Sequence, residues 1–244
     1  MKTSGGSDAA KRRAGESAAE TVTDGDVVGL GTGSTAAHAI RRIGDRVDSG
    51  LDARGVPTSF ASRELAAEAG VPCLDLPDAV GPDGPGIDLA VDGADQVATG
   101  VEGGGARDPG GALIKGGGAA HAREKLVDAA ADRFLVVADP SKESPRLDRS
   151  VPVEVLPAGR TAVAAAVREA GGEPALRRAE RKDGPVVTDN GNLVVDCAFD
   201  EIADPAALSA TLSSIPGVVE HGLFVGLADE IHVGTESGVR VEEY

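Results

Sequence analysis

The sequence is poor in aromatic residues, in sulfur and in lysine. Its 244 residues include four Phe, one Tyr, no Trp, one Met and two Cys. Cys73 and Cys197 stand far apart beside apolar neighbours, and neither a Cys-x-x-Cys nor a His-x-x-x-His spacing occurs. These absences exclude a disulfide framework and the usual zinc motifs. We therefore expect two buried, reduced thiols and no structural metal.

A basic surface and a long apolar run are also missing. There are 40 acidic side chains against 24 basic ones, which gives a formal net charge of -16. Nucleic acids and anionic membranes require basic groups to neutralise phosphates, so the charge argues against both partners. No apolar run approaches the ~20 residues of a membrane helix. The first residues, MKTSGGSDAAKRRAGES, lack the apolar core of a secretion signal. We expect a soluble, cytoplasmic protein.

The acidic excess has two interpretations. Only six of the basic residues are Lys and 18 are Arg, which is typical of GC-rich codon usage. The alternative is a surface adapted to concentrated salt, where high ionic strength screens self-repulsion. We favour salt adaptation, because codon usage alone does not explain so large an excess of Asp and Glu.

Salt adaptation predicts that stability depends on salt. The melting temperature should rise from low-salt buffer to molar KCl, because added ions screen the repulsion among acidic side chains. Thermal unfolding at a series of KCl concentrations measures this dependence. A melting temperature that is unchanged in low-salt buffer contradicts the interpretation.

The N-terminal part alternates strand-like and helix-like segments, which is typical of a parallel sheet with helices on its faces. The expected strands and extended pieces are 27–31, 56–61, 71–76, 87–91 and 134–138. The expected helices are 7–20, 35–47, 62–69 and 119–131. The glycine-rich stretches 81–86 and 100–111 are expected to be loops.

The pattern changes near Pro145 to that of a small α+β domain. The expected elements are strand 151–156, helix 161–170, strand 175–179, an extended piece 186–188, strand 193–198, helix 205–213 and strand 218–224. An Asp-Asn-Gly-Asn turn precedes strand 193–198 and is a strong hairpin signal. Segments 230–234 and 239–242 either pair as a hairpin or return to the first sheet.

The sequence therefore predicts an α/β protein with two domains. The first is a Rossmann-like, mostly parallel sheet domain over residues 1–148, completed by a C-terminal return of 228–244. The second is a smaller α+β domain of the ferredoxin-like βαββαβ type over residues 149–227.

The first candidate motif runs from an apolar strand into a helix. It reads GLGTGST over residues 29–35 and supplies four candidate binding residues, Thr32, Gly33, Ser34 and Thr35. Glycines let backbone N–H groups converge on an anion, and a helix N-terminus adds partial positive charge. Ser34 stands where a dinucleotide fingerprint has its third glycine, and no acidic residue ends the next strand. The motif favours a single phosphate, and its alternative is a tight turn without ligand.

The second candidate motif follows the apolar strand 87–91. It consists of Asp92, Gly93, Ala94 and Asp95. Carboxylates at the carboxyl end of a parallel strand lie where open α/β sheets bind ligands, and there they can exchange protons with substrate hydroxyls. The alternatives are an Asx-turn, a helix cap or a metal pair.

The third candidate motif combines a lysine, three glycines and a helix. Lys115 is followed by Gly116, Gly117 and Gly118, and Glu124 stands early in the next helix. Successive glycine amides form an anion nest, and the Lys115 ammonium can meet an oxyanion. Glu124 is a candidate general base. Its alternative role is to complement the helix dipole.

Lysines are so few that their positions are informative. Lys142 lies in the run Asp-Pro-Ser-Lys after another apolar strand. It is a candidate partner for a phosphate, and its alternative is an exposed lysine in a turn.

Taken together, these motifs resemble those of ribose-5-phosphate isomerases of the A type. The runs GLGTGSTAAH, VDGADQV, IKGGGAAHAREK, VADPSK, VVTDNGN and IPGVVEHGLF occur in this order. The resemblance extends from about Lys11 to Val239. It implies an aldose–ketose isomerase that interconverts D-ribose 5-phosphate and D-ribulose 5-phosphate through a cis-enediolate, in the non-oxidative pentose phosphate pathway. It implies no metal, no nucleotide cofactor and a homodimer or homotetramer.

The same resemblance implies roles for the catalytic candidates. Glu124 matches the base that moves a proton between C2 and C1. Lys115 and the amides of residues 116–118 match the group that stabilises the enediolate oxygens. Asp92 and Asp95 match carboxylates that assist ring opening and hydroxyl proton transfer.

The binding candidates follow in the same way. Residues 32–35 match a substrate-binding loop, and Lys142 with Lys11 matches the cations that hold the phosphate. Two positions depart from the pattern. Gln96 stands where a Glu is expected, and the 100–111 loop is longer than expected.

Three other functions remain open at this point. One is a related sugar-phosphate enzyme of the amino-sugar phosphate deaminase kind. The second is a non-catalytic regulator that binds sugar phosphates, and the acidic charge argues against the DNA-binding head it normally carries. The third is a structural dimerisation module, which has no need of Glu124, Lys115 and the acid pair together.

Overall fold

The computed structural model describes residues 6–100, 111–181, 183–200 and 202–244. Contacts within the chain divide it into two units, neither of which is a continuous stretch. The α/β unit contains the described residues up to Ala94, with Arg123–Lys142 and Leu227–Tyr244. The α+β unit contains the described residues of Asp95–Ala122 and Glu143–Gly226. This division differs from the expected boundaries at residues 95–122, 143–148 and 227. The expected domains, 1–148 with 228–244 and 149–227, stay a prediction.

The α/β unit is built on a six-stranded, mostly parallel sheet. Its strands are β1 (Val27–Leu30), β2 (Arg54–Pro57), β3 (Leu89–Gly93), β6 (Phe134–Ala138), β13 (Glu230–Gly234) and β14 (Val239–Glu243). They lie in the order β14-β13-β6-β3-β1-β2, and only the β13–β14 pair is antiparallel. The order reverses between β1 and β3. In open α/β sheets, ligands bind at the carboxyl ends of the strands beside such a reversal.

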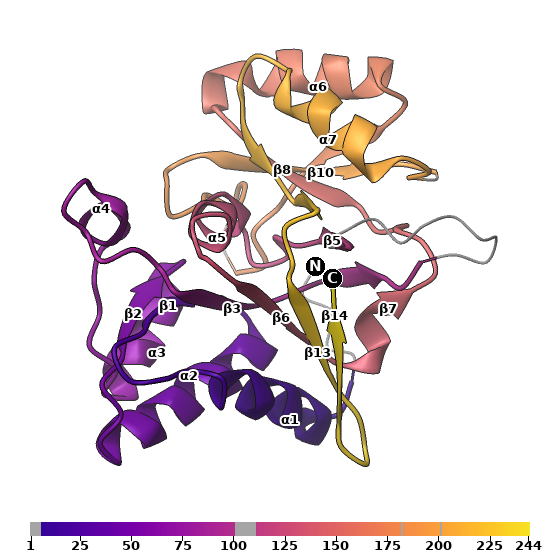
Figure 1. The fold of residues 1–244 in the computed structure, drawn as a ribbon. Coiled ribbons are helices and arrows are strands. Elements are labelled where there is room, and N and C mark those ends of the chain that lie inside the picture. The colour runs from indigo at the N-terminus through magenta and orange to yellow at the C-terminus, as the bar shows by residue number, and fades with distance from the viewer. Residues whose placement is uncertain (1–5, 101–110, 182, 201) are drawn as a thin grey trace. The chain divides into compact units, whose positions relative to one another are not determined.

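Helices cover both faces of this sheet. They are α1 (Asp8–Ala19), α2 (Ser34–Asp48), α3 (Phe60–Glu68), α4 (Leu76–Val80) and α5 (His121–Asp128). Helices α1, α2 and α3 share one core with Val28 of β1. Helices α4 and α5 share a second core with the neighbouring Val27, because successive side chains of a strand point to opposite faces. Figure 1 shows α1 and α2 side by side against the sheet.

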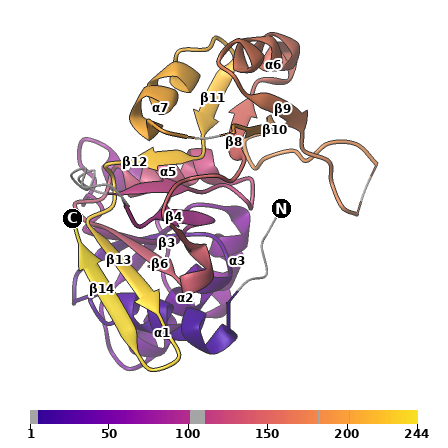
Figure 2. The same ribbon diagram turned by 90° about the vertical axis from the view of Figure 1, so that its right-hand side faces the viewer.

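The α+β unit contains a four-stranded antiparallel sheet with two helices. Its elements are β8 (Val151–Val155), α6 (Arg160–Glu169), β9 (Glu173–Leu176), β10 (Leu193–Ala198), α7 (Pro205–Ser213) and β11 (Val218–His221). The sheet order is β11-β8-β10-β9. Figure 2 shows α6 and α7 on the same face of this sheet. The unit therefore has the expected ferredoxin-like βαββαβ arrangement.

A second small sheet completes the α+β unit. Its strands are β4 (Gln96–Ala98), β5 (Ala112–Ile114), β7 (Glu143–Ser144) and β12 (Leu223–Val225), in the order β12-β5-β4-β7. A short 3-10 helix, η2 (Pro157–Gly159), follows β8 in this unit, and another, η1 (Pro140–Lys142), follows β6 in the α/β unit. The expected strand 218–224 is wrong as one element, because it divides into β11 and β12 of different sheets. Gly222 separates them, and a Cβ there would lie 2.2 Å from the carbonyl oxygen of Lys115.

Three further expectations have different outcomes. The segment 71–76 is not a strand: only Cys73 forms a single bridge, to Gly55, and α4 begins at Leu76. Pro72 has no N–H to donate to a ladder. The C-terminal segment forms a hairpin and also joins the first sheet, so both alternatives for it occur at once. The expected loop 100–111 lies mostly outside the described residues.

The two thiols differ from each other. Cys197 is buried in the core, and burial together with the charge of Asp196 raises the pKa of its thiol to about 12. Cys73 is only partly buried, so the expectation of two buried thiols is wrong for it. Both cysteines are free. No helix in the described part of the chain is long and apolar enough to span a bilayer.

Candidate active site

The loop after β1 and the first carboxylate after β3 form one group at the reversal of the sheet. The Oδ1 atom of Asp92 accepts hydrogen bonds from the amide of Thr32 at 3.0 Å and from that of Gly93 at 2.6 Å. Asp92 is completely buried. A Cβ on Gly31 would lie 2.2 Å from Cγ of Asp92, so only glycine lets β1 end against this carboxylate. Two motifs that the sequence presents 60 residues apart are therefore directly bonded.

Two hydroxyl residues that the sequence analysis missed hold Thr32 in place. Its Oγ1 atom donates to Oγ of Ser59 at 2.7 Å and lies 3.0 Å from Oγ1 of Thr58. Thr58 in turn donates to the carbonyl of Leu30. Ser59 is also the N-cap of α3, in a capping box with Ser62. A Thr-Ser pair between a strand and a helix was the signal that could have revealed this cap.

The N-terminus of α2 is built for an anion. Gly33 is its N-cap with φ of 124°, and no side chain caps the helix. The first turn contains no acidic residue, although the chain is rich in Asp and Glu. Ser34 is exposed and Thr35 is buried in this turn. The amides and dipole of a 15-residue helix favour a phosphate here.

Lys11 lies on the helix that packs against this N-terminus. A Cβ on Gly15 would lie 2.8 Å from the carbonyl oxygen of Thr35, so α1 and the first turn of α2 are in close contact. Lys11 is one turn before Gly15 and shares its face of α1. Its side chain is buried. The sequence expectation of a cation near the phosphate loop is consistent with this position.

Lys142 belongs to the short η1 helix at the end of β6. Its amide donates to the carbonyl of Asp139, and the Asp139 carboxylate accepts from the amide of Ser141. The Lys142 side chain is only 8% exposed, so the alternative of an exposed turn lysine is wrong.

Glu124 lies on the inward face of α5. It is 3% exposed and stands one turn before Val127, which packs in the core against the sheet. A Cβ on Gly29 would lie 2.6 Å from Cγ1 of Val127, so this glycine of β1 lets α5 approach the strand closely. The sheet therefore fixes the helix that carries the expected base.

In the α+β unit, the second carboxylate of the acid pair holds the glycine turn. Oδ2 of Asp95 accepts a hydrogen bond from the amide of Gly117 at 2.6 Å. The amide of Ala119 donates to the carbonyl of Gly116, which closes the turn. Gly116 has φ of 97°, and a Cβ there would lie 2.7 Å from the His121 ring. One of the three glycine amides is therefore committed to Asp95.

Lys115 precedes this turn and is held at both ends. Its backbone amide donates to the carbonyl of Gly222 at 2.8 Å. Its Nζ atom lies 5.2 Å from the centroid of the Phe224 ring, a cation–π distance. The side chain is 1% exposed. A charge so well screened from water interacts strongly with any anion that reaches it.

Gln96, which departs from the expected Glu, has a structural role. Its Oε1 atom accepts from the amides of Asp148 and Arg149, at 3.0 and 3.1 Å. Its Nε2 atom donates to the carbonyl of Arg146 and to the Asp148 carboxylate. A Glu cannot make the last two bonds, because an ionised carboxylate only accepts. The substitution thus stabilises a turn of the α+β unit.

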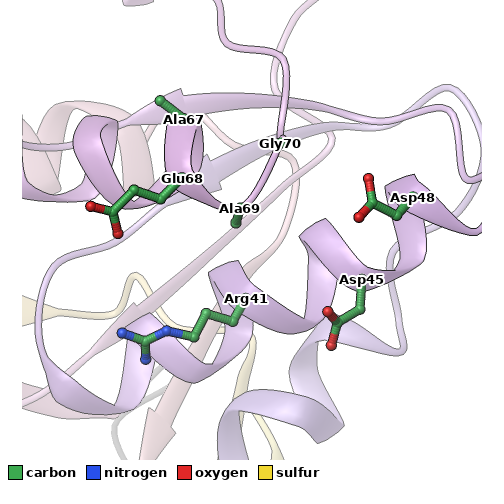
Figure 3. A pocket seen from close by; sticks show the side chains of 7 residues that line it. All are labelled: Arg41, Asp45, Asp48, Ala67, Glu68, Ala69 and Gly70. Carbon is green, nitrogen blue, oxygen red and sulfur yellow. The ribbon is translucent and has the colours of Figure 1, made fainter.

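A surface hollow elsewhere contains none of the expected site residues. It measures about 440 Å³ and is lined by Arg41, Asp45, Asp48 and residues 67–70 of α2, α3 and the following turn (Figure 3). Its lining has three carboxylates and one guanidinium, with no hydroxyl, thiol, imidazole or amine side chain among them. Within the described residues, no three His, Cys, Asp or Glu side chains gather as metal ligands.

The fold and these groups define a class of protein. An uncapped helix N-terminus lies beside a buried carboxylate at the reversal of a parallel sheet, and a buried lysine precedes a glycine turn. Such groups are typical of enzymes that act on small phosphorylated substrates.

Comparison with known proteins identifies the family. The model of the family described as ribose 5-phosphate isomerase A (phosphoriboisomerase A) matches residues 54–238. The chain is 83% identical over 241 residues to ribose-5-phosphate isomerase A of Halorubrum lacusprofundi, covering 99% of both chains. It is 66% identical to that of Haloarcula marismortui, covering 97% of this chain and 96% of the relative.

Solved structures agree with this match. The structure of ribose 5-phosphate isomerase A from Methanocaldococcus jannaschii has 40% identity and a TM-score of 0.86, over 96% of this chain and 98% of that one. A D-ribose-5-phosphate isomerase in complex with phospho-erythronic acid has 39% identity and a TM-score of 0.86, over 96% and 97% of the two chains.

The chain belongs to the ribose 5-phosphate isomerase A family. It is an enzyme of the isomerase class, and the relatives that it matches are named ribose-5-phosphate isomerase A. The resemblance found in the sequence is confirmed, and the deaminase and regulator alternatives are not favoured. The relatives from salt-loving archaea also favour salt adaptation as the reason for the acidic composition.

Proposed function

We propose that this isomerase interconverts D-ribose 5-phosphate and D-ribulose 5-phosphate through a cis-enediolate. Glu124 is the base that takes the proton from C2 of the sugar and returns it to C1. The observation that carries this proposal is the course of α5. The helix begins at His121, directly after the glycine turn, and its first turn carries Glu124 in a buried position. Residues 119 and 120 and the first turn of α5 thus connect the candidate oxyanion donors with the candidate base along the chain.

We propose that Lys115 and the glycine turn stabilise the enediolate oxygens. A carboxylate removes a proton next to a carbonyl only if the negative charge that develops on oxygen is stabilised at once. The buried ammonium of Lys115 supplies charge for this purpose, and the amides of Gly116 and Gly118 supply hydrogen-bond donors. The amide of Gly117 contributes indirectly, because Asp95 holds it.

The remaining residues are assigned to ring opening and binding. Asp92 and Asp95 exchange protons with the sugar hydroxyls, which opens the furanose ring before isomerisation. The loop of residues 32–35 and the backbone of Gly93 and Ala94 bind the substrate at the end of the sheet. Lys11 and Lys142 pair with its phosphate, and we propose no metal or cofactor.

The experiment that tests the proposal is an assay of ribulose 5-phosphate formation in molar KCl with EDTA present. We expect full activity, because every proposed step uses side chains or backbone amides of this chain and no metal ion. Loss of activity on chelation would reopen Asp92 and Asp95 as a metal pair and contradict the proposed roles.

Inhibition by phospho-erythronic acid adds a second readout to the same assay. The carboxylate of this four-carbon acid carries charge on two oxygens, as an enediolate does. It should therefore compete with ribose 5-phosphate at a lower concentration than inorganic phosphate does. Equal inhibition by the two would contradict an enediolate-stabilising site.

We further propose that the enzyme works in the cytoplasm as a homodimer or homotetramer. The sugar-phosphate substrate supports a cytoplasmic location. The strongly acidic composition supports the absence of nucleic-acid and membrane partners. Light scattering in molar KCl measures the oligomeric state, and a monomer would contradict it.

A further inference from the structure

Arg177, which no motif singled out, contacts the glycine turn. It follows β9, and its backbone is fixed on both sides: its amide donates to Val194, and its carbonyl accepts from Val186. Its side chain is 10% exposed. Nη1 donates to the carbonyl of Gly116 at 2.9 Å and to that of Gly117 at 3.3 Å.

The other edge of the same guanidinium is paired with Asp196. Nε donates to Oδ2 at 2.9 Å, and Nη2 donates to Oδ1. This bidentate pair fixes the plane of the guanidinium. Asp196 belongs to β10, next to β9 in the sheet. The sheet therefore holds Arg177 with its free edge toward the turn.

The turn needs such a restraint. Three consecutive glycines have more backbone freedom than any other tripeptide. The turn also ends at Ala119, whose φ of 62° is unfavourable for a residue with a Cβ. An isolated segment of this kind would populate many conformations, and only some of them direct its amides together.

The carbonyl contacts decide where the amides point. A peptide unit is planar and trans, so its C=O and N–H point in opposite directions. With the Gly116 carbonyl on Arg177, the Gly117 amide points the other way, to Asp95. With the Gly117 carbonyl also on Arg177, the Gly118 amide points away from the guanidinium. The positive charge of Arg177 at the Gly117 carbonyl also polarises this peptide unit, which makes the Gly118 N–H a stronger hydrogen-bond donor.

We propose that Arg177, held by Asp196, is a positioning residue for the isomerisation. It orients the glycine turn so that the Gly118 amide donates to the enediolate oxygens. This inference rests on the proposed role of the turn, and its test separates the two.

The test is the Arg177→Met variant. It keeps an unbranched side chain but removes the positive charge and the planar set of N–H donors. We expect kcat to fall by between about 10-fold and 10²-fold, because small misplacements of reacting groups have effects of that size. The KM for ribose 5-phosphate should change little, since the bond to Gly118 strengthens only as charge develops.

Inhibition constants provide a readout that a general loosening of the structure would not reproduce. In Arg177→Met, the inhibition constant of phospho-erythronic acid should rise by about the factor by which kcat falls. The inhibition constant of inorganic phosphate should stay unchanged, because the residues proposed to bind phosphate belong to the α/β unit. Equal weakening of both inhibitors would overturn the proposal in favour of a structural role.

Neighbouring residues supply matched variants. Arg178→Met makes the same change at the next, exposed position and should retain wild-type kcat. Arg177→Lys keeps the charge but lacks the planar guanidinium that pairs with Asp196 and the turn, so its kcat should remain below that of the wild type. If Arg177→Met does not fold, Asp196→Asn leaves Arg177 in place with a weaker partner and should show a smaller loss of the same kind. Wild-type kcat in both Asp196→Asn and Arg177→Lys would overturn the proposal.

Failure of this inference is distinguishable from failure of the proposed function. If Glu124→Gln is inactive and Arg177→Met retains wild-type kcat, only the positioning role falls. If Glu124→Gln retains wild-type turnover, the proposed mechanism falls, and the role of Arg177 in it falls too.

Discussion

The Glu124→Gln variant is expected to lose at least ~10²-fold in kcat with little change in KM. Glutamine has nearly the same shape as glutamate and can occupy the same buried position on α5. It cannot accept a proton from C2, however, so the step that forms the enediolate loses its base. Initial rates of ribulose 5-phosphate formation in molar KCl with EDTA, measured beside the wild type, give both constants.

An exposed position supplies the control for this change. Glu169→Gln makes the same substitution at the end of α6 and should leave kcat unchanged. Exchange of the C2 hydrogen of the substrate with deuterated solvent should be lost together with turnover. Turnover close to that of the wild type would show that Glu124 is not the base.

The Lys115→Met variant is expected to lose about 10²–10³-fold in kcat, the usual effect of removing one oxyanion-stabilising group. Methionine preserves the unbranched shape of the side chain and its contact with Phe224, but it carries no charge. Because the lysine is 1% exposed, water cannot replace the missing ammonium at the enediolate. Steady-state kinetics and inhibition by phospho-erythronic acid measure the loss.

The two kinetic constants separate possible roles of Lys115. A lower kcat with unchanged KM indicates an interaction made as charge develops, as proposed. An unchanged kcat with a raised KM would instead mean that Lys115 only binds the substrate. Circular dichroism and the melting temperature show whether the variant retains its fold.

The sequence was most informative where local chemistry decides the structure. Strand β6 was predicted to the residue, because five consecutive apolar residues are typical of a strand buried on both faces. Helix α7 was predicted equally well, since Asp204 caps it and Pro205 occupies its first position. The glycine motifs were recognised for the same reason: a positive φ at Gly33 and Gly116 and close contacts at Gly29 and Gly31 leave little choice of residue.

Contacts between distant parts of the chain were not accessible in this way. Nothing around Arg177 indicates that its side chain bonds to carbonyls 60 and 61 residues earlier. Thr58 and Ser59 were placed in an extended piece, whereas Ser59 caps α3, and the bonds of both hydroxyls to Thr32 depend on the pairing of β1 with β2. The break at Gly222 likewise depends on the carbonyl of Lys115. Such features follow from tertiary packing.

The order of strands in the α/β unit has a consequence for biosynthesis. Strand β13 pairs with β6, yet nearly a hundred residues separate the two in the chain. Until the C-terminal segment leaves the ribosome, β6 has one open edge with five buried apolar residues behind it. An open, apolar edge invites pairing with other chains. The nascent protein must therefore delay or protect this sheet during most of its synthesis.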